Sequence, residues 1–95
     1  MNASDEWAEV QVRIQNRLGL HARPAMSFVD MANGFASDIR VGKGTQQVDG
    51  KSIMQMTMLA ATCGTKLKIS TEGPDAAEAV DRLAEILERT GEDSD

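Results

Sequence analysis

The sequence predicts an α+β open-faced sandwich, in which three helices cover one face of a four-stranded antiparallel sheet. Two observations support this prediction. Apolar residues recur at every second position in some segments, as in half-buried strands, and at every third or fourth position in others, as in amphipathic helices. In chain order these segments give β-α-β-β-α-β-α, and one sheet with helices on a single face would bury their apolar sides together. The length of 95 residues suits one domain of this kind.

The first strand and the first helix are expected on either side of a short break. Residues 9–15 alternate apolar and polar side chains, which predicts a half-buried strand. Residues 16–19 interrupt the alternation, residues 22–32 continue with helical spacing, and Asn33-Gly34 is a natural helix stop. The side chains expected inward are Val10, Val12 and Ile14 in the strand, and Ala22, Ala25, Met26, Val29 and Ala32 in the helix.

A hairpin and a second, shorter helix are expected next. Ile39 and Val41 alternate with charged residues, residues 42–44 form a glycine-containing turn, and residues 45–49 are typical of a weak strand. Ser52 then stands three residues before Gln55, which is the spacing of a capping box at a helix start. The helix is expected to continue through residues 56–61 and to end at residues 63–65.

The last strand and the last helix complete the pattern. Residues 66–71 alternate with Leu67 and Ile69 inward, and residues 73–75 open a helix. The apolar positions of this helix keep helical spacing at Ala76, Ala79, Val80, Leu83 and Leu87. We expect one domain over residues 9–89, with a flexible tail over residues 1–8 and an acidic tail over residues 90–95.

Charge and residue usage argue against several classes of function. Ten basic and fifteen acidic residues give a net charge of −5, whereas a nucleic-acid binder needs a basic face. The chain has a single cysteine and no Cys/His cluster with metal-ligand spacing, and no metal or cofactor is expected. Neither a signal-peptide pattern nor an apolar run of membrane-spanning length is present. We therefore expect a cytoplasmic protein without nucleic-acid or membrane partners.

The single histidine stands between the first strand and the first helix. Free backbone N–H groups and the helix dipole make a helix start a ready anion site, and the guanidinium of Arg23 suits phosphate oxygens. A neutral imidazole at His21 could then serve as the nucleophile that accepts a phosphoryl group. Because residues two apart do not share a helical face, His21 is expected at the helix cap rather than inside the helix. The simpler interpretation of His21 is an ordinary cap, with Arg23 as a solvated charge.

A family resemblance favours the phosphoryl interpretation. Residues 18–25, Leu-Gly-Leu-His-Ala-Arg-Pro-Ala, resemble the active-site signature of HPr proteins, the histidine phosphocarriers of the bacterial phosphoenolpyruvate-dependent phosphotransferase system. The resemblance covers about residues 9–88, in the family's order of elements. It implies that His21 is phosphorylated on Nδ1 by Enzyme I, that Arg23 helps neutralise the phosphoryl charge, and that the group passes to Enzyme II A components in sugar uptake. It further implies that the protein is a carrier rather than an enzyme, and that it is a monomer, as is typical of the family.

The resemblance also implies a partner surface and a regulatory site. Positions that match the family's apolar contact patch carry Met26, Ser27, Ile53 and Met54, although the helical spacing of Met26 equally fits a core position. Ser52 resembles the serine that an HPr kinase/phosphorylase modifies, while helix capping alone also explains a serine at this position. Two alternatives stay open. One is a nitrogen- or carbon-control phosphorelay carrier without sugar transport, because Leu18 is similar to the nitrogen-related branch; the other is a partner-binding α+β domain that is never phosphorylated.

Overall fold

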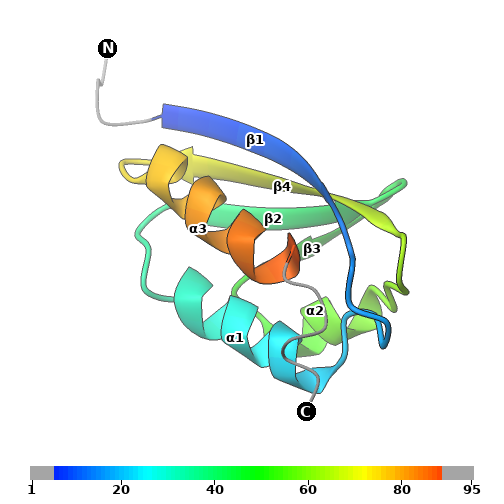
Figure 1. Ribbon diagram of the computed structural model, residues 1–95. Helices are drawn as coiled ribbons and strands as arrows, with labels where there is room; N and C mark the ends of the chain where they lie inside the picture. The colour runs from blue at the N-terminus through cyan, green and yellow to red at the C-terminus, as the bar shows by residue number, and fades with distance from the viewer. Residues whose placement is uncertain (1–5, 89–95) are drawn as a thin grey trace.

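The computed structural model describes residues 6–88, and its elements follow the predicted order (Figure 1). This order confirms the α+β class. The elements are β1 (Glu6–Arg13), α1 (Ala22–Ala32), β2 (Asp38–Lys43), β3 (Gln46–Asp49), α2 (Ile53–Met58), β4 (Lys66–Gly73) and α3 (Ala76–Glu88).

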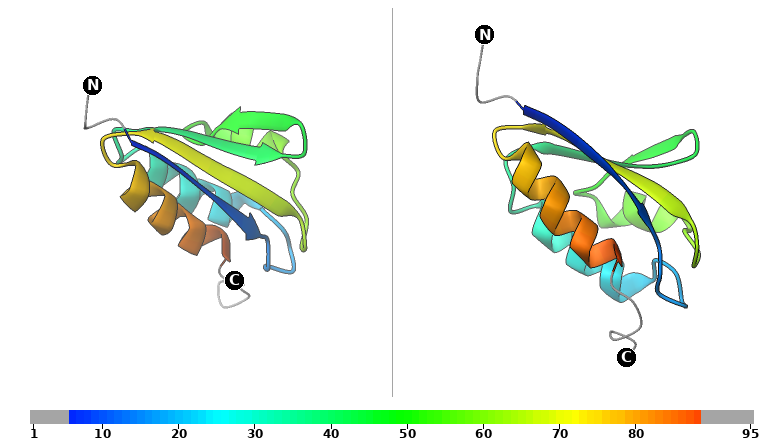
Figure 2. Two further views of the ribbon diagram at one scale, coloured as in Figure 1. Left: turned by 90° about the horizontal axis from the view of Figure 1, so that it is seen from above. Right: turned by 45° about the horizontal axis from the view of Figure 1, so that its top comes forward.

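The four strands form one antiparallel sheet in the order β1-β4-β2-β3. The long first and fourth strands pair along their whole length, from Glu6 opposite Gly73 to Arg13 opposite Lys66. All three helices lie on one side of the sheet and leave its other face uncovered (Figure 2). The predicted open-faced sandwich is therefore the observed arrangement.

The core lies between the covered face of the sheet and the helices. Ile39, Leu67 and Ile69 of the strands pack in one cluster with Phe28 of α1 and Leu83 of α3. All five side chains are fully buried. Burying each such side chain contributes about 1.5–3 kcal/mol. The apolar side chains that alternate along the strands and recur along the helices therefore pack in one layer.

The first strand starts earlier than the sequence predicts. It begins at Glu6 rather than at residue 9, because β4 extends to Gly73 and supplies a hydrogen-bonding partner for these added residues. Residues 6–8, expected in a flexible tail, therefore belong to the sheet. Residues 1–5 and the acidic tail expected over residues 90–95 lie outside the described part of the chain.

The buried faces of the first two helices also differ from the prediction. In α1, Ala22 and Met26 are exposed and Phe28 is buried instead, because the helix packs against α3 as well as towards the sheet. The second helix ends at Met58 rather than at residue 61, since Ala60 has a φ of 51° and leaves the helical region. In α3 every predicted inward residue is buried.

A carboxylate joins the start of α3 to the loop before β2. Asp75 accepts hydrogen bonds from the backbone N–H groups of Ala36 and Ser37, both at 2.9 Å, and from the Ser37 hydroxyl. The Ser37 hydroxyl, followed by the Ala36 N–H, holds the pKa of this carboxyl below its ordinary value of 3.8. Asp75 therefore holds two segments together that lie 38 residues apart.

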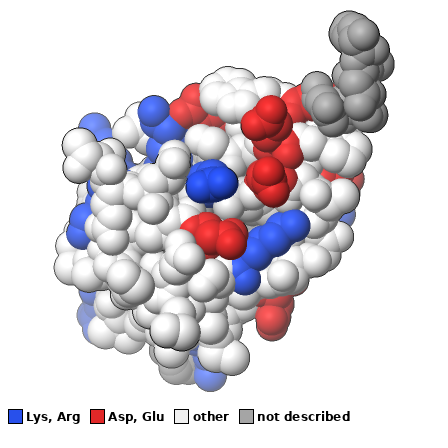
Figure 3. Space-filling view, turned by 180° about the vertical axis from the view of Figure 1, so that it is seen from behind, with Lys and Arg blue, Asp and Glu red and all other residues white. Residues whose placement is uncertain are grey.

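One face of the molecule carries charges of both signs close together. Seen from behind, acidic and basic side chains are intermingled, with uncharged atoms between them (Figure 3). Within residues 6–88, no helix is both long enough and apolar enough to cross a membrane.

Candidate functional site

His21 occupies the N-cap position of α1, as the sequence predicts. Its backbone is extended, with φ −91° and ψ −171°, and its carbonyl accepts the first helical hydrogen bond, from Ala25 N–H at 3.1 Å. The side chain makes no capping hydrogen bond and is half-buried. The imidazole is therefore held beside the helix start without closing it.

A glycine two residues earlier fixes the path of the chain into this cap. Gly19 has a φ of +75°, and a Cβ built on it would lie 2.5 Å from the carbonyl oxygen of Ala61. The same carbonyl accepts a hydrogen bond from Leu20 N–H at 2.8 Å. The loop before α1 thus packs directly on the backbone that follows α2, and only glycine fits this approach without strain.

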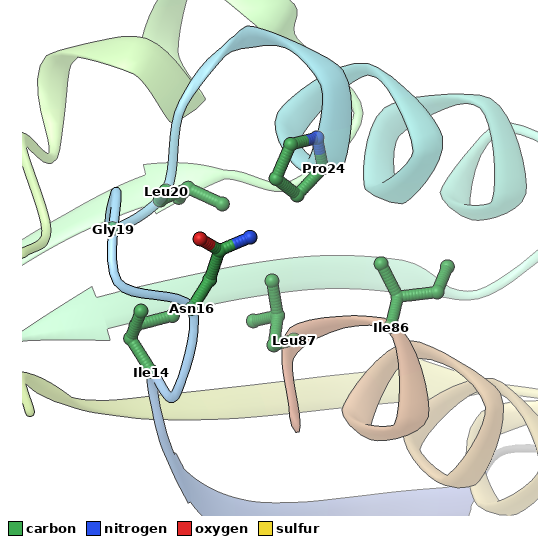
Figure 4. A pocket seen from close by; sticks show the side chains of 7 residues that line it. All are labelled: Ile14, Asn16, Gly19, Leu20, Pro24, Ile86 and Leu87. Atoms are coloured by element: carbon green, nitrogen blue, oxygen red, sulfur yellow. The ribbon is translucent and has the colours of Figure 1, made fainter. Parts of the chain in front are cut away.

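Asn16 lies against the imidazole at Nε2. Its Oδ1 accepts a hydrogen bond from Leu18 N–H at 2.9 Å, and its Nδ2 lies 3.4 Å from His21 Nε2. Only 7% of Asn16 is exposed, and Figure 4 shows its amide in a crevice between Gly19, Leu20 and Pro24, above Leu87. This contact leaves Nδ1 as the ring nitrogen that Asn16 does not touch.

Sequence reasoning missed Asn16 as a functional residue. In the sequence it belongs to a short break between strand and helix, and asparagine is common in turns for local reasons. Its five-residue separation from His21 is compatible with contact, but no periodicity predicts it. Only the shape of the loop brings the two side chains together.

Arg23 lies in the first turn of α1, because the helix begins at Ala22. Its side chain is exposed. Pro24 is buried in the same turn, where its missing N–H removes no hydrogen bond. A helix start carries the positive end of the helix dipole, which favours negative charge there. This end of the helix, with an arginine and an imidazole beside it, can hold an anion such as a phosphoryl group.

The four residues assigned to a partner surface are all exposed. Met26 is 55% exposed and Met54 is 74% exposed, and Ser27 and Ile53 are exposed as well. The alternative that Met26 belongs to the core is therefore wrong. Leu18 and Met58, which the sequence analysis did not assign to a partner surface, are each 64% exposed.

These side chains lie on neighbouring parts of the molecule. The helices α1 and α2 pack against each other, and the loop that carries Leu18 is hydrogen-bonded to the segment after α2. We use the name apolar surface for the exposed residues Leu18, Met26, Ile53, Met54 and Met58.

Ser52 caps α2. Its Oγ accepts a hydrogen bond from Gln55 N–H at 3.2 Å, as the capping interpretation predicts. The reciprocal half of the capping box is missing, because the Gln55 side-chain oxygen accepts instead from Asp49 N–H at 2.9 Å. The hydroxyl of Ser52 is therefore already engaged in the structure.

Ligands for a metal ion do not gather in the described structure. Among residues 6–88, no three His, Cys, Asp or Glu side chains stand close enough to share an ion. The chemistry of the site is that of an imidazole, an arginine and a helix start.

Comparison with known proteins agrees with this arrangement. The family model for the PTS HPr component phosphorylation site matches residues 8–89. The phosphocarrier protein HPr of Pseudomonas aeruginosa is 46% identical over 79 residues, which are 82% of this chain and 88% of that protein. The crystal structure of HPr-C-His from Thermoanaerobacter tengcongensis has a TM-score of 0.82 at 43% identity, and covers 85% of this chain and 91% of that one.

The class defined by the fold and by these matches is a phosphocarrier protein, which transfers a phosphoryl group and is not itself a catalyst. The chain belongs to the HPr family of the phosphotransferase system. A similar structure from Thermoanaerobacter tengcongensis, with a TM-score of 0.68, 43% identity and coverage of 85% of this chain and 93% of that one, is described as an HPr dimer. Family membership implies partners in phosphoryl transfer.

Proposed function

We propose that His21 accepts a phosphoryl group on Nδ1 from phospho-Enzyme I and passes it to an Enzyme II A component of a sugar phosphotransferase system. The observation that carries this proposal is the open cap of α1. The imidazole stands at a helix start that its own side chain does not close, and Asn16 approaches the ring at Nε2. Nδ1 is thereby the nitrogen left to face an incoming phosphorus atom.

The guanidinium of Arg23 and the dipole of α1 support the same role for this helix start. A phosphoryl group on His21 carries negative charge, which the helix dipole and a guanidinium both stabilise. Transfer between two histidines changes little covalent chemistry in the carrier, so positioning and charge stabilisation are what the site has to supply. The helix start and the guanidinium of Arg23 beside His21 are suited to both tasks.

The apolar surface beside His21 is proposed as the docking site for both partners. Exposed methionines adapt their shape and suit a surface that binds more than one protein. Docking through Met26, Ser27, Ile53 and Met54 requires that this surface be free, so we propose that the protein works as a monomer. We also propose that it acts in the cytoplasm, together with Enzyme I. Sedimentation at micromolar concentration tests the monomer, and a stable dimer there would contradict it.

The first experiment measures phosphoryl uptake directly. The protein is incubated with phosphoenolpyruvate and Enzyme I, and its intact mass is followed together with the stability of the adduct. One phosphate that is lost in acid, survives in base and is absent from His21→Ala is the expected result. An Enzyme I from the same organism that adds no phosphate would exclude the carrier function and leave a partner-binding domain.

The acceptor side distinguishes sugar transport from a control relay. The phosphorylated protein is offered a sugar-specific Enzyme II A component and, separately, a nitrogen-control one. Faster transfer to the sugar component is expected. Met54→Ala should slow this transfer, whereas Trp7→Ala removes another well-exposed apolar side chain near the start of β1, far from the apolar surface, and should not. Preference for the nitrogen-control acceptor would favour the regulatory alternative.

We also propose Ser52 as a site of regulatory phosphorylation by an HPr kinase/phosphorylase. Ser52 immediately precedes Ile53 and Met54 of the apolar surface, so a phosphoryl group there would place charge at the docking site. Incubation with ATP and this kinase should give a base-labile, acid-stable adduct that Ser52→Ala lacks. No adduct would restrict Ser52 to helix capping.

A further inference from the structure

The orientation of the Asn16 amide is set by a backbone group. Leu18 N–H can only donate a hydrogen bond, and it lies 2.9 Å from the side chain of Asn16. The amide oxygen must therefore face Leu18, and the NH2 group must face His21 Nε2, 3.4 Å away. The network, rather than a free choice of rotamer, decides which end of the amide meets the ring.

This orientation selects one tautomer of the resting imidazole. An NH2 group only donates, so Nε2 must accept, and a neutral ring then carries its proton on Nδ1. A protonated Nδ1 has no lone pair with which to attack phosphorus. The geometry that satisfies Asn16, Leu18 and His21 together is thus a resting form of the carrier.

The reactive form reverses the roles of the two ring nitrogens. The half-buried ring reaches this form when Nδ1 releases its proton to water and Nε2 takes one from water. The Nδ1 lone pair then attacks the phosphorus of the donor phosphohistidine. The new N–P bond forms as the donor's N–P bond breaks, the donor nitrogen keeps that electron pair, and Nε2 keeps its proton throughout. His21 therefore presents an N–H at Nε2 in the phosphorylated state, where the resting state presents a lone pair.

Asn16 cannot serve both of its neighbours once Nε2 is a donor. If the amide keeps its orientation, two donors face each other at His21; if it turns over, two donors face each other at Leu18. Water has little access to relieve the conflict, because Asn16 is 7% exposed. A buried polar group left without a partner is costly, so one of the two contacts has to open.

We infer that Asn16 is a positioning residue that couples the phosphoryl state of His21 to the backbone at Leu18. On phosphorylation the amide turns its oxygen to Nε2–H, and the hydrogen bond from Leu18 N–H opens. Leu18 carries a side chain that is 64% exposed on the apolar surface. The resting and phosphorylated carriers then present different surfaces to the donor and the acceptor. This inference rests on the proposed phosphorylation of Nδ1.

Nuclear magnetic resonance of the 15N-labelled protein tests the coupling. The resting protein, at a pH where the ring is neutral, should show a pyrrole-type shift at Nδ1 and a pyridine-type shift at Nε2. After phosphorylation by phosphoenolpyruvate and Enzyme I, the amide resonance of Leu18 should move and its exchange with deuterium should become faster.

Two variants separate the switch from a structural effect of the loop. In Asn16→Asp a carboxylate of nearly the same shape accepts from both Leu18 N–H and Nε2–H, so the ring should change to the Nε2–H tautomer. The Leu18 amide of this variant should no longer respond to phosphorylation. Gln15→Glu adds the same charge at the neighbouring exposed position, and its ring tautomer and Leu18 response should match the parent protein.

The possible outcomes distinguish this inference from the proposed function. A phosphate on His21 with an unchanged Leu18 amide would overturn the coupling and leave the carrier function standing. A resting ring with its proton already on Nε2 would overturn it as well. If no phosphate is taken up at all, the proposed function fails and the coupling fails with it.

Discussion

The starts of α1 and α2 are two helix ends of one molecule with opposite uses. At α2 the side chain of Ser52 accepts from Gln55 N–H and closes the end. At α1 the capping residue is His21, whose side chain makes no such bond and lies instead against Asn16. The end with a good capping residue is stabilised locally, and the end without a side-chain cap keeps its dipole available to another anion.

This difference shows how the fold supports a helix end that has no side-chain cap. A missing cap costs α1 about 1 kcal/mol in stability. The surroundings hold the open end in place, because the backbone of Leu20 is hydrogen-bonded to Ala61 and Pro24 is buried. Tertiary contacts thus supply the rigidity that local capping does not.

Replacing His21 by a residue that caps well should remove the difference between the starts of α1 and α2. His21→Ser gives α1 the kind of cap that α2 already has, so phosphoryl uptake from Enzyme I should be abolished. The free energy of unfolding should rise by about 1 kcal/mol, because a hydroxyl now accepts from the first turn. Intact mass and urea unfolding measure the two effects. A His21→Ser protein that is markedly less stable would show that the imidazole also supports the fold.

The glycine in the loop before α1 should be sensitive to the addition of a single methyl group. Gly19→Ala combines a left-handed backbone with a Cβ 2.5 Å from Ala61 O, and should lower the free energy of unfolding by about 2–4 kcal/mol. Gly44→Ala is the matched control, because its φ is +61° but its Cβ would meet nothing within 4 Å. The control should lose only about 1 kcal/mol. Equal losses in urea unfolding would mean that the approach to Ala61 is not restrictive.

Removal of the cap from α2 should have a smaller effect. Ser52→Ala should cost about 1 kcal/mol in the free energy of unfolding, because Gln55 N–H loses its acceptor. Phosphoryl uptake on His21 should be unchanged. Ser52→Asp should restore the stability while slowing transfer to the acceptor. If Ser52→Ala also stops phosphoryl uptake, the two helix ends are not independent.

The start of α3 gives the smallest effect and a third kind of helix end. The carboxylate of Asp75 faces the loop at Ala36 and Ser37, and these contacts lower its pKa. Because the folded pKa lies below the unfolded one, the contribution of Asp75 to stability is present above the unfolded value and is lost as the pH falls through the folded value.

Urea unfolding at neutral pH and at about pH 3 measures this contribution. Asp75→Asn should be less stable than the parent at neutral pH, and the difference should shrink in acid. Asp81→Asn, at an exposed carboxylate on the same helix, should leave the acid dependence nearly unchanged. A constant difference between Asp75→Asn and the parent at both pH values would contradict this account.

The sequence by itself determined the element order, the position of His21 at a helix cap and most of the inward residues. Each of these depends on short-range patterns. The alternation around Leu67 and Ile69, the spacing of Leu83 and Leu87, and the distance from Ser52 to Gln55 are all legible within a few residues.

The tertiary structure alone decided which side chains surround His21 and which apolar side chains are exposed. Gly19 meets Ala61 across more than forty positions, and β1 gains residues because β4 extends beside it. Met26 is exposed because of the way α1 packs against α3. The orientation of the Asn16 amide follows from the hydrogen bond that Leu18 N–H donates to its oxygen. Periodicity describes one element at a time, whereas these contacts depend on how separate elements pack, so no local pattern could predict them.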